Sequence, residues 1–281
     1  MAQTIFITGA SSGIGLASAK LFLAKGWNVV ATMRSPEQDT ELKQLDPTRI
    51  LVLRLDLQDH SCLSPAIDTA IAKFGKIDVL LNNAGFAQNG LFETISRQQI
   101  QQQFDVNVFG VMDMTRAILP HFHQHNGGGI VNVSSGAGYY GLPMVSVYNA
   151  SKFALEGFTE SLAFELASQN IFVKNVVPHG GVVATNFGNR STAADGMRPD
   201  AAPEPYRRFM ERTGQRFWEV FKGMNIRPEA VAGMVYEAAT DGKEKLRYPV
   251  FGEDTKDIVK ARFGSKGDED EYIRYMRALF G

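Results

Sequence analysis

The strongest constraint on the fold is an alternation of short apolar runs with helical patterns along most of the chain. Seven runs predict strands, at 4–8, 28–33, 50–55, 78–82, 129–134, 172–177 and 248–251. Several of them are almost continuously apolar, as expected of strands that are buried on both faces. Amphipathic stretches between them, such as 13–25 and 59–73, are long enough for crossover helices. The alternation predicts a three-layer, doubly wound α/β fold with a parallel Rossmann-like sheet.

One segment, 186–225, breaks this rhythm. Its first half is rich in Gly, Pro, Ala and Asp and is typical of a loop, whereas its second half has aromatic residues at helical spacing. Long insertions in compact α/β domains often serve as lids. Because the alternation resumes afterwards, we expect one domain over 1–281 with 186–225 as a lid.

Composition excludes several classes of protein. The net charge is −1 at pH 7, which argues against a nucleic-acid-binding protein. Cys62 is the only cysteine, so neither an intrachain disulfide nor a cysteine-based zinc site can form. The N-terminal apolar run is too short for a signal peptide, and no segment approaches the roughly 20 apolar residues of a membrane span. We therefore expect a cytoplasmic protein with no membrane span.

A glycine-rich turn joins the first predicted strand to the first helix. Residues 8–15 read "TGASSGIG", with Gly9, Gly13 and Gly15 in a G-x-x-x-G-x-G spacing. Glycines permit close approach of a phosphate, and a helix N-terminus offers free N–H donors. Leu16 follows the last glycine where a P-loop needs lysine, and the G-x-G-x-x-G spacing is absent. A tight turn without a ligand is the alternative, but the position at the first strand end favours a binding site.

Further motifs follow the turn in order. They are "DL" (56–57), "NNAG" (82–85), "VNVSS" (131–135) and "YNASK" (148–152). Together with the turn they resemble the short-chain dehydrogenase/reductase family, over about residues 3–187. The resemblance implies a single Rossmann-like domain that transfers hydride between a nicotinamide cofactor and an alcohol or carbonyl.

The resemblance also assigns four catalytic residues. Tyr148 would act as the acid and base, and Lys152, which lies on the same helix face, would bind the nicotinamide ribose. A nearby ammonium favours the phenolate, so we expect it to pull the tyrosine pKa down from its ordinary value near 10. Ser135, 13 residues before the tyrosine, would bind the substrate oxygen, whereas Ser134 would be structural. Asn107 would hold a helix kink and a water that bridges to the lysine.

Residues at several strand ends would hold the dinucleotide. Asp56 and Leu57 would contact the adenine, although a helix-capping aspartate is the alternative. Asn82, Ala84 and Gly85 of the "NNAG" motif would contact the adenosine ribose and pack the sheet. The expected cofactor contacts are Gly9, Ser11, Ser12, Gly13, Ile14, Gly15, Arg34, Asp56, Leu57, Asn82, Ala84, Gly85, Tyr148, Lys152, Pro178, Gly180, Val183 and Thr185.

The end of the second strand bears on the choice of cofactor. Relatives that prefer NAD carry an acidic residue there, but this chain has Met33 followed by Arg34. A guanidinium pairs with a phosphate through two hydrogen bonds. We therefore expect NADP(H), with NAD(H) possible if Arg34 is only a solvated loop residue.

The chain departs from the family after the sixth strand. Relatives have Pro-Gly and then a threonine near the nicotinamide, whereas "PHGGVVATNF" (178–187) is about two residues longer. Pro178, Gly180, Val183 and Thr185 would keep the usual role. His179 is interpreted either as an added polar group near the cofactor or as a loop residue.

The substrate is expected to be a bulky hydrophobic alcohol or ketone, because the lid is rich in apolar and aromatic residues. The chain is closest in pattern to 17β-hydroxysteroid and retinol dehydrogenases. The alternative is that the lid aromatics only pack the lid against the body. The expected substrate contacts are Ser135, Tyr140, Tyr148, Phe187 and Phe217.

Other signals and functions remain to be weighed. We expect no metal: the histidines of "HFHQH" (121–125) alternate along a helix and do not face one another, so a solvated helix end is favoured.

The helices expected near 97–125 and 148–168 are those through which relatives dimerise, so the resemblance implies a homodimer or homotetramer. The rival functions are a nucleotide-sugar epimerase or dehydratase and a non-catalytic dinucleotide sensor, but sensors generally lose the tyrosine or lysine that this chain has.

Overall fold

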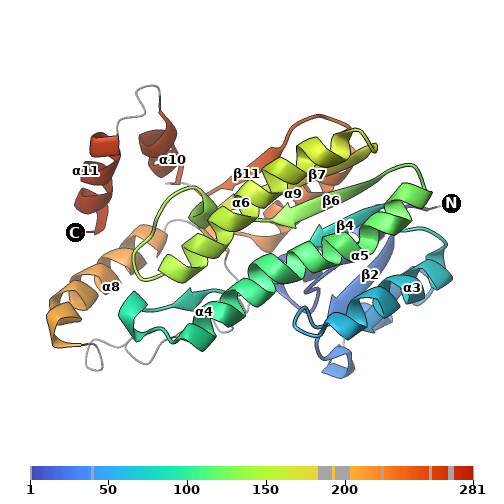
Figure 1. The fold of residues 1–281 in the computed structure, drawn as a ribbon, viewed down its shortest axis with the longest axis horizontal. Coiled ribbons are helices and arrows are strands. Elements are labelled where there is room, and N and C mark those ends of the chain that lie inside the picture. Colours follow the sequence, from blue (N-terminus) through green and yellow to red (C-terminus); the bar gives the residue numbers. More distant parts are fainter. Residues whose placement is uncertain are drawn as a thin grey trace.

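A seven-stranded parallel sheet runs through the centre of the molecule (Figure 1), in the order β11-β7-β6-β4-β1-β2-β3. The computed structural model describes residues 2–38, 41–182, 192–193, 203–222, 225–252, 255–264 and 269–280. The strands are β1 (Thr4–Ile7), β2 (Asn28–Met33), β3 (Ile50–Arg54), β4 (Val79–Asn82), β6 (Gly128–Val133), β7 (Ile171–His179) and β11 (Arg247–Phe251). All six neighbouring pairs are parallel. The seven predicted strands and the parallel sheet are confirmed.

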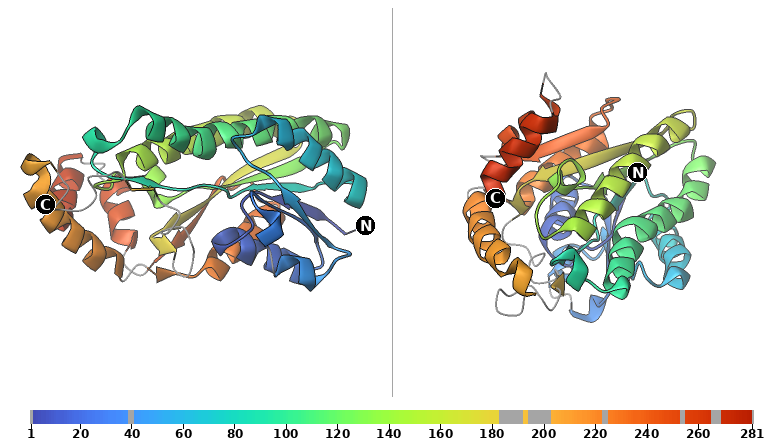
Figure 2. Two further views of the ribbon diagram at one scale, coloured as in Figure 1. Left: turned by 90° about the horizontal axis from the view of Figure 1, so that it is seen from below. Right: turned by 60° about the vertical axis from the view of Figure 1, so that its left-hand side comes forward.

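Helices cover both faces of the sheet (Figure 2). One layer contains α3 (Leu63–Phe74), α5 (Gly110–Gln124) and α6 (Ser146–Ala167), and the other contains α1 (Gly13–Ala24) and α9 (Pro228–Thr240). β1 shows how the sheet serves both layers: Ile5 and Ile7 join the core formed with α1 and α9, whereas Phe6 joins the core formed with α3, α5 and α6. Successive strand residues face opposite sides of a sheet, so an apolar strand such as β1 is buried only if a core lies on each side. The predicted three-layer arrangement is confirmed.

Further elements lie beyond the carboxyl ends of the strands (Figure 1). They include α4 (Arg97–Phe104), α8 (Arg207–Lys222), α10 (Thr255–Phe263) and α11 (Glu269–Phe280), while the four-residue α2 (Leu42–Leu45) precedes β3. Two short pairs, β5 (Gln88–Asn89) with β9 (Thr192–Ala193) and β8 (Gly181–Val182) with β10 (Asn225–Ile226), tie parts of the insertion to the main chain. The helix predicted for the second half of the insertion is α8.

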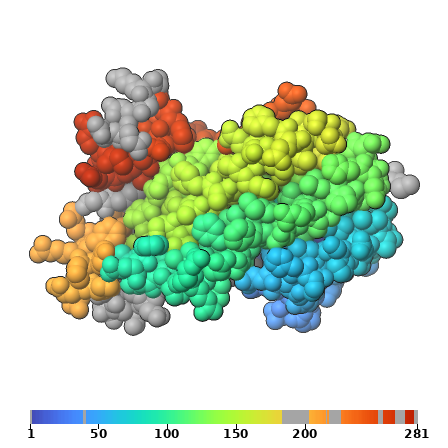
Figure 3. Space-filling model, viewed as in Figure 1, coloured from blue at the N-terminus to red at the C-terminus, as the bar shows by residue number. Residues whose placement is uncertain are grey.

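The layer that contains α6 presents a continuous surface formed by α4, α5 and α6 side by side (Figure 3). Between α4 and α5 the helix widens into a π-helical turn at Asp105–Phe109. Such turns occur frequently at functional sites. No helix within the described residues is both long and apolar enough to cross a membrane.

Candidate active site

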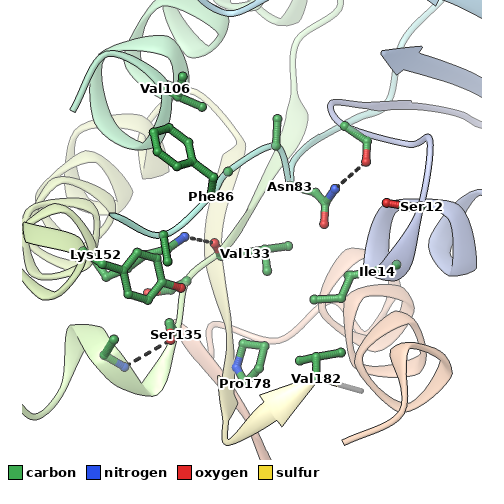
Figure 4. Close-up of a pocket in the computed structure, with 18 of the residues that line it drawn as sticks. Ser12, Ile14, Asn83, Phe86, Val106, Val133, Ser135, Lys152, Pro178 and Val182 are labelled. Atoms are coloured by element: carbon green, nitrogen blue, oxygen red, sulfur yellow. Dashed lines mark hydrogen bonds between the residues drawn. The ribbon is translucent and has the colours of Figure 1, made fainter. Parts of the chain in front are cut away.

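A cavity of about 710 Å³ opens at the carboxyl ends of the central strands. Its wall is formed by the β1–α1 turn, by residues that follow β2, β3, β4, β6 and β7, and by the start of α6. In Figure 4, Ser12 and Asn83 lie opposite Lys152 and Ser135, with Phe86 and Val106 at one end and Pro178 and Val182 at the other. The volume is within the range of small-molecule sites, and open α/β sheets bind ligands at this edge.

The glycine turn is packed too tightly for side chains. Gly9 has φ +70°, and a Cβ on it would lie 2.8 Å from the Cα of Ala84. A Cβ on Gly15 would lie 2.4 Å from the carbonyl oxygen of Gly9 and 2.6 Å from Nδ2 of Asn83. Gly15 therefore lies behind the turn, whereas Gly9, Ser11, Ser12, Gly13 and Ile14 line the cavity. Ser12 makes no side-chain cap for α1, so the N–H groups at this helix start face the cavity without a capping partner from that residue.

Tyr148, Lys152 and Ser135 meet at one wall. α6 begins at Ser146 and places Tyr148 and Lys152 one turn apart. Nζ of Lys152 donates to the carbonyl of Val133 at 2.9 Å and lies 5.8 Å from the centre of the Tyr148 ring. The Tyr148 hydroxyl is hydrogen-bonded to the side chain of Ser135, which also accepts from the backbone N–H of Ala137 at 3.1 Å. The three side chains expected to act together are adjacent.

The protonation states differ from the expectation. Burial raises the pKa of Tyr148 to about 12, against a smaller lowering by the bond to Ser135. Part of this side chain remains accessible at the wall of the cavity. The predicted lowering of the tyrosine pKa by Lys152 is therefore wrong for this structure, because burial dominates and the opposing effect comes from the bond to Ser135. Burial also lowers the pKa of Lys152 to about 8, and Glu156 acts in the opposite direction.

Asn107 lies in the π-helical turn and contacts the chain that follows β4. Its Oδ1 accepts from the N–H of Phe86 at 3.2 Å, and its Nδ2 donates to the Phe86 carbonyl at 2.9 Å and to Oγ of Ser151 at 3.4 Å. A helix irregularity is present where the resemblance implied one. Asn107 does not line the cavity, but its bonds hold the backbone of Phe86, which lines it. The bond to Ser151, the residue before Lys152, connects Asn107 to α6.

The adenine end of the predicted site is formed by β2 and β3. Arg34 is exposed at the rim, and Asp56 and Leu57 line the wall beside it. The carboxylate of Asp56 accepts from the N–H of Gln58 at 3.1 Å within its own turn. It does not cap a helix, because the next helical segment begins at His60 with Asp59 at its N-cap. Among the described lining residues, Asp56 is the only acidic one.

In the "NNAG" segment the cavity residue is Asn83 and not Asn82. Asn82 ends β4 and donates to Oδ1 of Asn132 inside the sheet at 2.9 Å. Asn83 lines the cavity with Ala84 and Gly85, and its Nδ2 donates to the carbonyls of Thr8 and Gly9. Sequence reasoning missed Asn83; its position one residue beyond the strand end was the available signal.

The segment after β6 and β7 forms the lower wall. Pro178 and Gly180 line the cavity, whereas His179 is 1% exposed and stacks on Phe251 with ring centres 4.8 Å apart. The interpretation of His179 as a loop residue is wrong, because β7 continues through it; its side chain is not among those that line the cavity. Burial lowers its pKa to about 4.

Several predicted contacts fall outside what the structure describes. Val183, Thr185 and Phe187 lie outside the described residues, and the side chain of Phe217 is likewise not described. Tyr140 is buried and lines the cavity as predicted. Apolar lining residues that sequence reasoning did not single out are Phe86, Val106, Leu142 and Val145.

The histidine cluster also differs from expectation at one position. His121 is buried, and its Nε2 accepts from the N–H of Ile77 at 3.0 Å. The prediction of a solvated helix end is therefore wrong for His121, although His123 and His125 are exposed. The described part of the chain contains no group of three His, Cys, Asp or Glu side chains placed to hold a metal ion.

Known proteins resemble this chain in sequence and in structure. The short chain dehydrogenase family model matches residues 3–196. An uncharacterized oxidoreductase of Schizosaccharomyces pombe, C162.03, is 33% identical over 272 residues, which cover 96% of this chain and 88% of the relative. The crystal structure of a short-chain dehydrogenase from Streptomyces avermitilis matches with a TM-score of 0.83 and 31% identity, and covers 99% of this chain and 98% of that one.

A further structural match was solved with a bound cofactor. The 3-ketoacyl-(acyl-carrier-protein) reductase of Brucella melitensis, in complex with NADH, has a TM-score of 0.71 and 25% identity, and covers 90% of this chain and 98% of that one. Other structurally similar chains were solved with NAD or NADP. The family match spans more than half of the chain and agrees with the sheet order and the motif positions described above. The chain is therefore an oxidoreductase that belongs to the short-chain dehydrogenase/reductase family.

Proposed function

We propose that this protein interconverts a carbonyl and a secondary alcohol on a hydrophobic substrate, with NADP(H) as the hydride carrier and Tyr148 as the acid and base. The observation that carries the proposal is the contact of Tyr148 with Ser135 at the cavity wall, one helical turn from the buried ammonium of Lys152. A carbonyl oxygen placed against both hydroxyls would accept one hydrogen bond from each.

The raised pKa of Tyr148 describes the proton donor that reduction of a carbonyl needs. With a pKa of about 12, the phenol is protonated at neutral pH and can donate its proton to the carbonyl oxygen as hydride reaches the carbon. Ser135 would hold that oxygen, and the charged Lys152 would stabilise the phenolate left behind. Asn107 would act through Phe86 and Ser151 by holding this wall in place.

The residues of the cavity fit a nicotinamide dinucleotide, which supplies the hydride when bound. The start of α1, which the Ser12 side chain does not cap, and the tight glycine turn suit the pyrophosphate. Asp56 and Leu57 would bind the adenine, Asn83, Ala84 and Gly85 the adenosine ribose, and Lys152 the ribose of the nicotinamide. Structurally similar proteins solved with NADH, NAD and NADP support the class of cofactor.

A preference for NADP(H) is proposed from the residues around the end of β2. Arg34 follows Met33 at the rim of the cavity, where its guanidinium can reach a 2′-phosphate. Asp56, from the next strand, is bonded to its own turn and is the one carboxylate among the described lining residues. A guanidinium in this place favours the phosphorylated cofactor by charge-assisted hydrogen bonds.

The substrate is proposed to be a bulky hydrophobic ketone or secondary alcohol, as in 17β-hydroxysteroid and retinol dehydrogenases. Beyond Ser135 and Tyr148, the cavity wall includes the side chains of Phe86, Val106, Leu142, Val145 and Tyr140, together with the polar Asn89 and Gln102. Such a wall stabilises an apolar substrate by roughly 25 cal/mol for each Å² of apolar surface removed from water.

Residues 186–225 are proposed to form a lid over this end of the cavity. The described portion supports this: Met210 of α8 and Tyr206 pack against Leu91 and Met144. Met144 lies between the lining residues Leu142 and Val145. The Tyr206 hydroxyl also donates to the carboxylate of Glu93 at 3.2 Å.

We also propose a homo-oligomer that forms through the surface of α5 and α6 (Figure 3). Two large aromatic side chains are exposed on or beside these helices: Phe164 of α6 is 76% exposed, and Phe109, directly before α5, is 45% exposed. Exposed apolar residues that gather on one surface favour association. Light scattering of wild type and of Phe164→Glu tests this, since the variant should be smaller.

Tyr148→Phe tests the catalytic proposal. We expect the rate of ketone reduction with NADPH to fall on the order of 10²–10⁴-fold, because the proton donor is removed. The Kd for NADPH should stay nearly constant. Tyr236→Phe is the matched control, since Tyr236 packs on Phe22 in the opposite layer. Weakened NADPH binding together with retained turnover in Tyr148→Phe would contradict the proposal. A wild-type protein that binds NADPH but reduces no carbonyl compound would also contradict it, because that is the behaviour of a sensor.

A further inference from the structure

A third ionisable group lies on the catalytic face of α6. Residues four apart share a helix face, so Tyr148 and Lys152 are followed on that face by Glu156. Glu156 is 6% exposed, and its Oε1 is buried without a hydrogen-bond partner among the described residues. A carboxylate in such surroundings is costly unless cations lie close to it. The function proposed above gives this residue no task.

Arg247 fixes the position of Glu156. Its Nε donates to Oε2 of Glu156 at 2.9 Å, and its guanidinium also pairs with Glu160 and with the hydroxyl of Tyr139. Arg247 opens β11, whose backbone is paired with β7. The carboxylate is thereby attached to the sheet, and it cannot turn toward solvent without losing this pair.

The loop that carries Ser135 packs against the same stretch of α6. A Cβ on Gly138 would lie 2.9 Å from the carbonyl oxygen of Lys152 and 3.0 Å from Cγ of Glu156. Nδ2 of Asn149 donates to the carbonyls of Ala137 and Tyr140, each at 2.7 Å. Glu156 is therefore enclosed by the elements that form the catalytic wall, where solvent screens its charge little.

Two cations lie near Glu156: Arg247, its ion-pair partner, and Lys152, one turn before it on the same helix face. Among the described residues, the other titratable groups near it are Glu160 of α6 and Tyr139 beside the Gly136–Gly138 turn. Burial depresses the pKa of Lys152, and Glu156 is the group that acts against this effect.

We propose that Glu156, held by Arg247, is a positioning residue that keeps the Lys152 ammonium charged at the cavity wall. What that ammonium does in turnover rests on the function proposed above. The charge of Lys152 itself is a property of the folded protein and can be measured without substrate.

The test is the pH dependence of acetylation of Lys152 by acetic anhydride, followed by mass spectrometry of the peptide that contains it. Only the neutral amine reacts, so the rate rises through the pKa, about 8 in the wild type. In Glu156→Gln the midpoint should fall by about one unit, because a nearby opposite charge is removed. The matched control is Glu160→Gln, which loses the same charge and also pairs with Arg247, but is 48% exposed and one turn farther away.

Two results would overturn the inference: an unchanged midpoint in Glu156→Gln, or an equal fall in Glu160→Gln. If Glu156→Gln does not fold, the double variant Glu156→Gln/Arg247→Met leaves no unpaired buried charge. Its midpoint should also fall below that of the wild type, and an unchanged or higher midpoint would contradict us.

Turnover separates this inference from the proposed function. The pH at which kcat for ketone reduction declines should fall in Glu156→Gln together with the acetylation midpoint. A shifted midpoint in a protein that reduces no ketone would support the role of Glu156 and refute the proposed reaction. Normal ketone reduction with no shift of either quantity would refute the role of Glu156 alone.

Discussion

Raising the pH from 7 to 9 should slow carbonyl reduction about tenfold. Lys152 has a pKa of about 8 in the folded protein, lowered by burial and partly restored by Glu156. A group with this pKa is about nine-tenths charged at pH 7 and about one-tenth charged at pH 9. Tyr148, whose burial raises its pKa to about 12, remains protonated across this window. The proton donor is thus constant, and only the charge that stabilises the resulting phenolate is lost.

The assay is kcat for reduction of a hydrophobic aryl ketone at saturating NADPH, followed by nicotinamide absorbance at several pH values. Lys152→Arg is the control: arginine stays charged up to about pH 12, so this variant should be slower but should lose the decline above pH 8. Equal rates at pH 7 and pH 9 in the wild type would refute the reasoning, as would a rate that rises over this window. Either result would mean that the charge of Lys152 does not limit the reaction.

Three further changes test separate parts of the structure. Arg34→Glu should raise the Kd for NADPH by about tenfold or more and leave the Kd for NADH nearly constant; equal losses would refute the cofactor preference. Gly15→Ala should abolish NADPH binding, because its Cβ would lie 2.4 Å from a carbonyl oxygen of the same turn. The control Gly233→Ala, whose Cβ would have no atom within 4 Å, should bind NADPH normally. Normal binding by both variants would refute this account of the turn. Burial raises the pKa of Asp241, but bonds that include one from Lys174 bring it to about 2. Asp241→Asn should therefore lower the free energy of unfolding by about 3 kcal/mol at pH 7, and the difference should shrink as the pH falls below about 4. Equal urea midpoints at pH 7 would contradict this.

The sheet could be predicted from the sequence because its signal is local. Ile5, Phe6 and Ile7 are all apolar and all buried, and such a run fits only a strand with a core on each face. The catalytic wall could be predicted for a similar reason. Tyr148 and Lys152 are set by helix spacing, and Ser135 by the end of the strand that precedes their helix.

Other features depend on contacts between distant segments, which no local pattern records. His121 looks like part of a solvated helix end, yet it is buried because the N–H of Ile77 bonds to its ring. His179 follows a proline and looks like a loop residue, but β11 extends the ladder to it through Phe251. Asn82 and Asn83 differ in role only because β4 ends between them.

The same limit applied to protonation. A lysine one turn from a tyrosine predicts a lowered tyrosine pKa, and this expectation omits the depth at which the hydroxyl lies. Burial of Tyr148 raises its pKa instead. The phenol therefore stays protonated at neutral pH, which is the form that donates a proton.

Transfer of deuterium tests the central claim most directly. The protein would be incubated with a hydrophobic ketone and NADPH that carries deuterium at the transferring carbon of the nicotinamide, and the alcohol product would be analysed by mass spectrometry. We predict deuterium on the carbinol carbon with the wild type and almost none with Tyr148→Phe under the same conditions. Alcohol that lacks deuterium, or equal incorporation by both proteins, would contradict hydride transfer at the wall formed by Ser135, Tyr148 and Lys152.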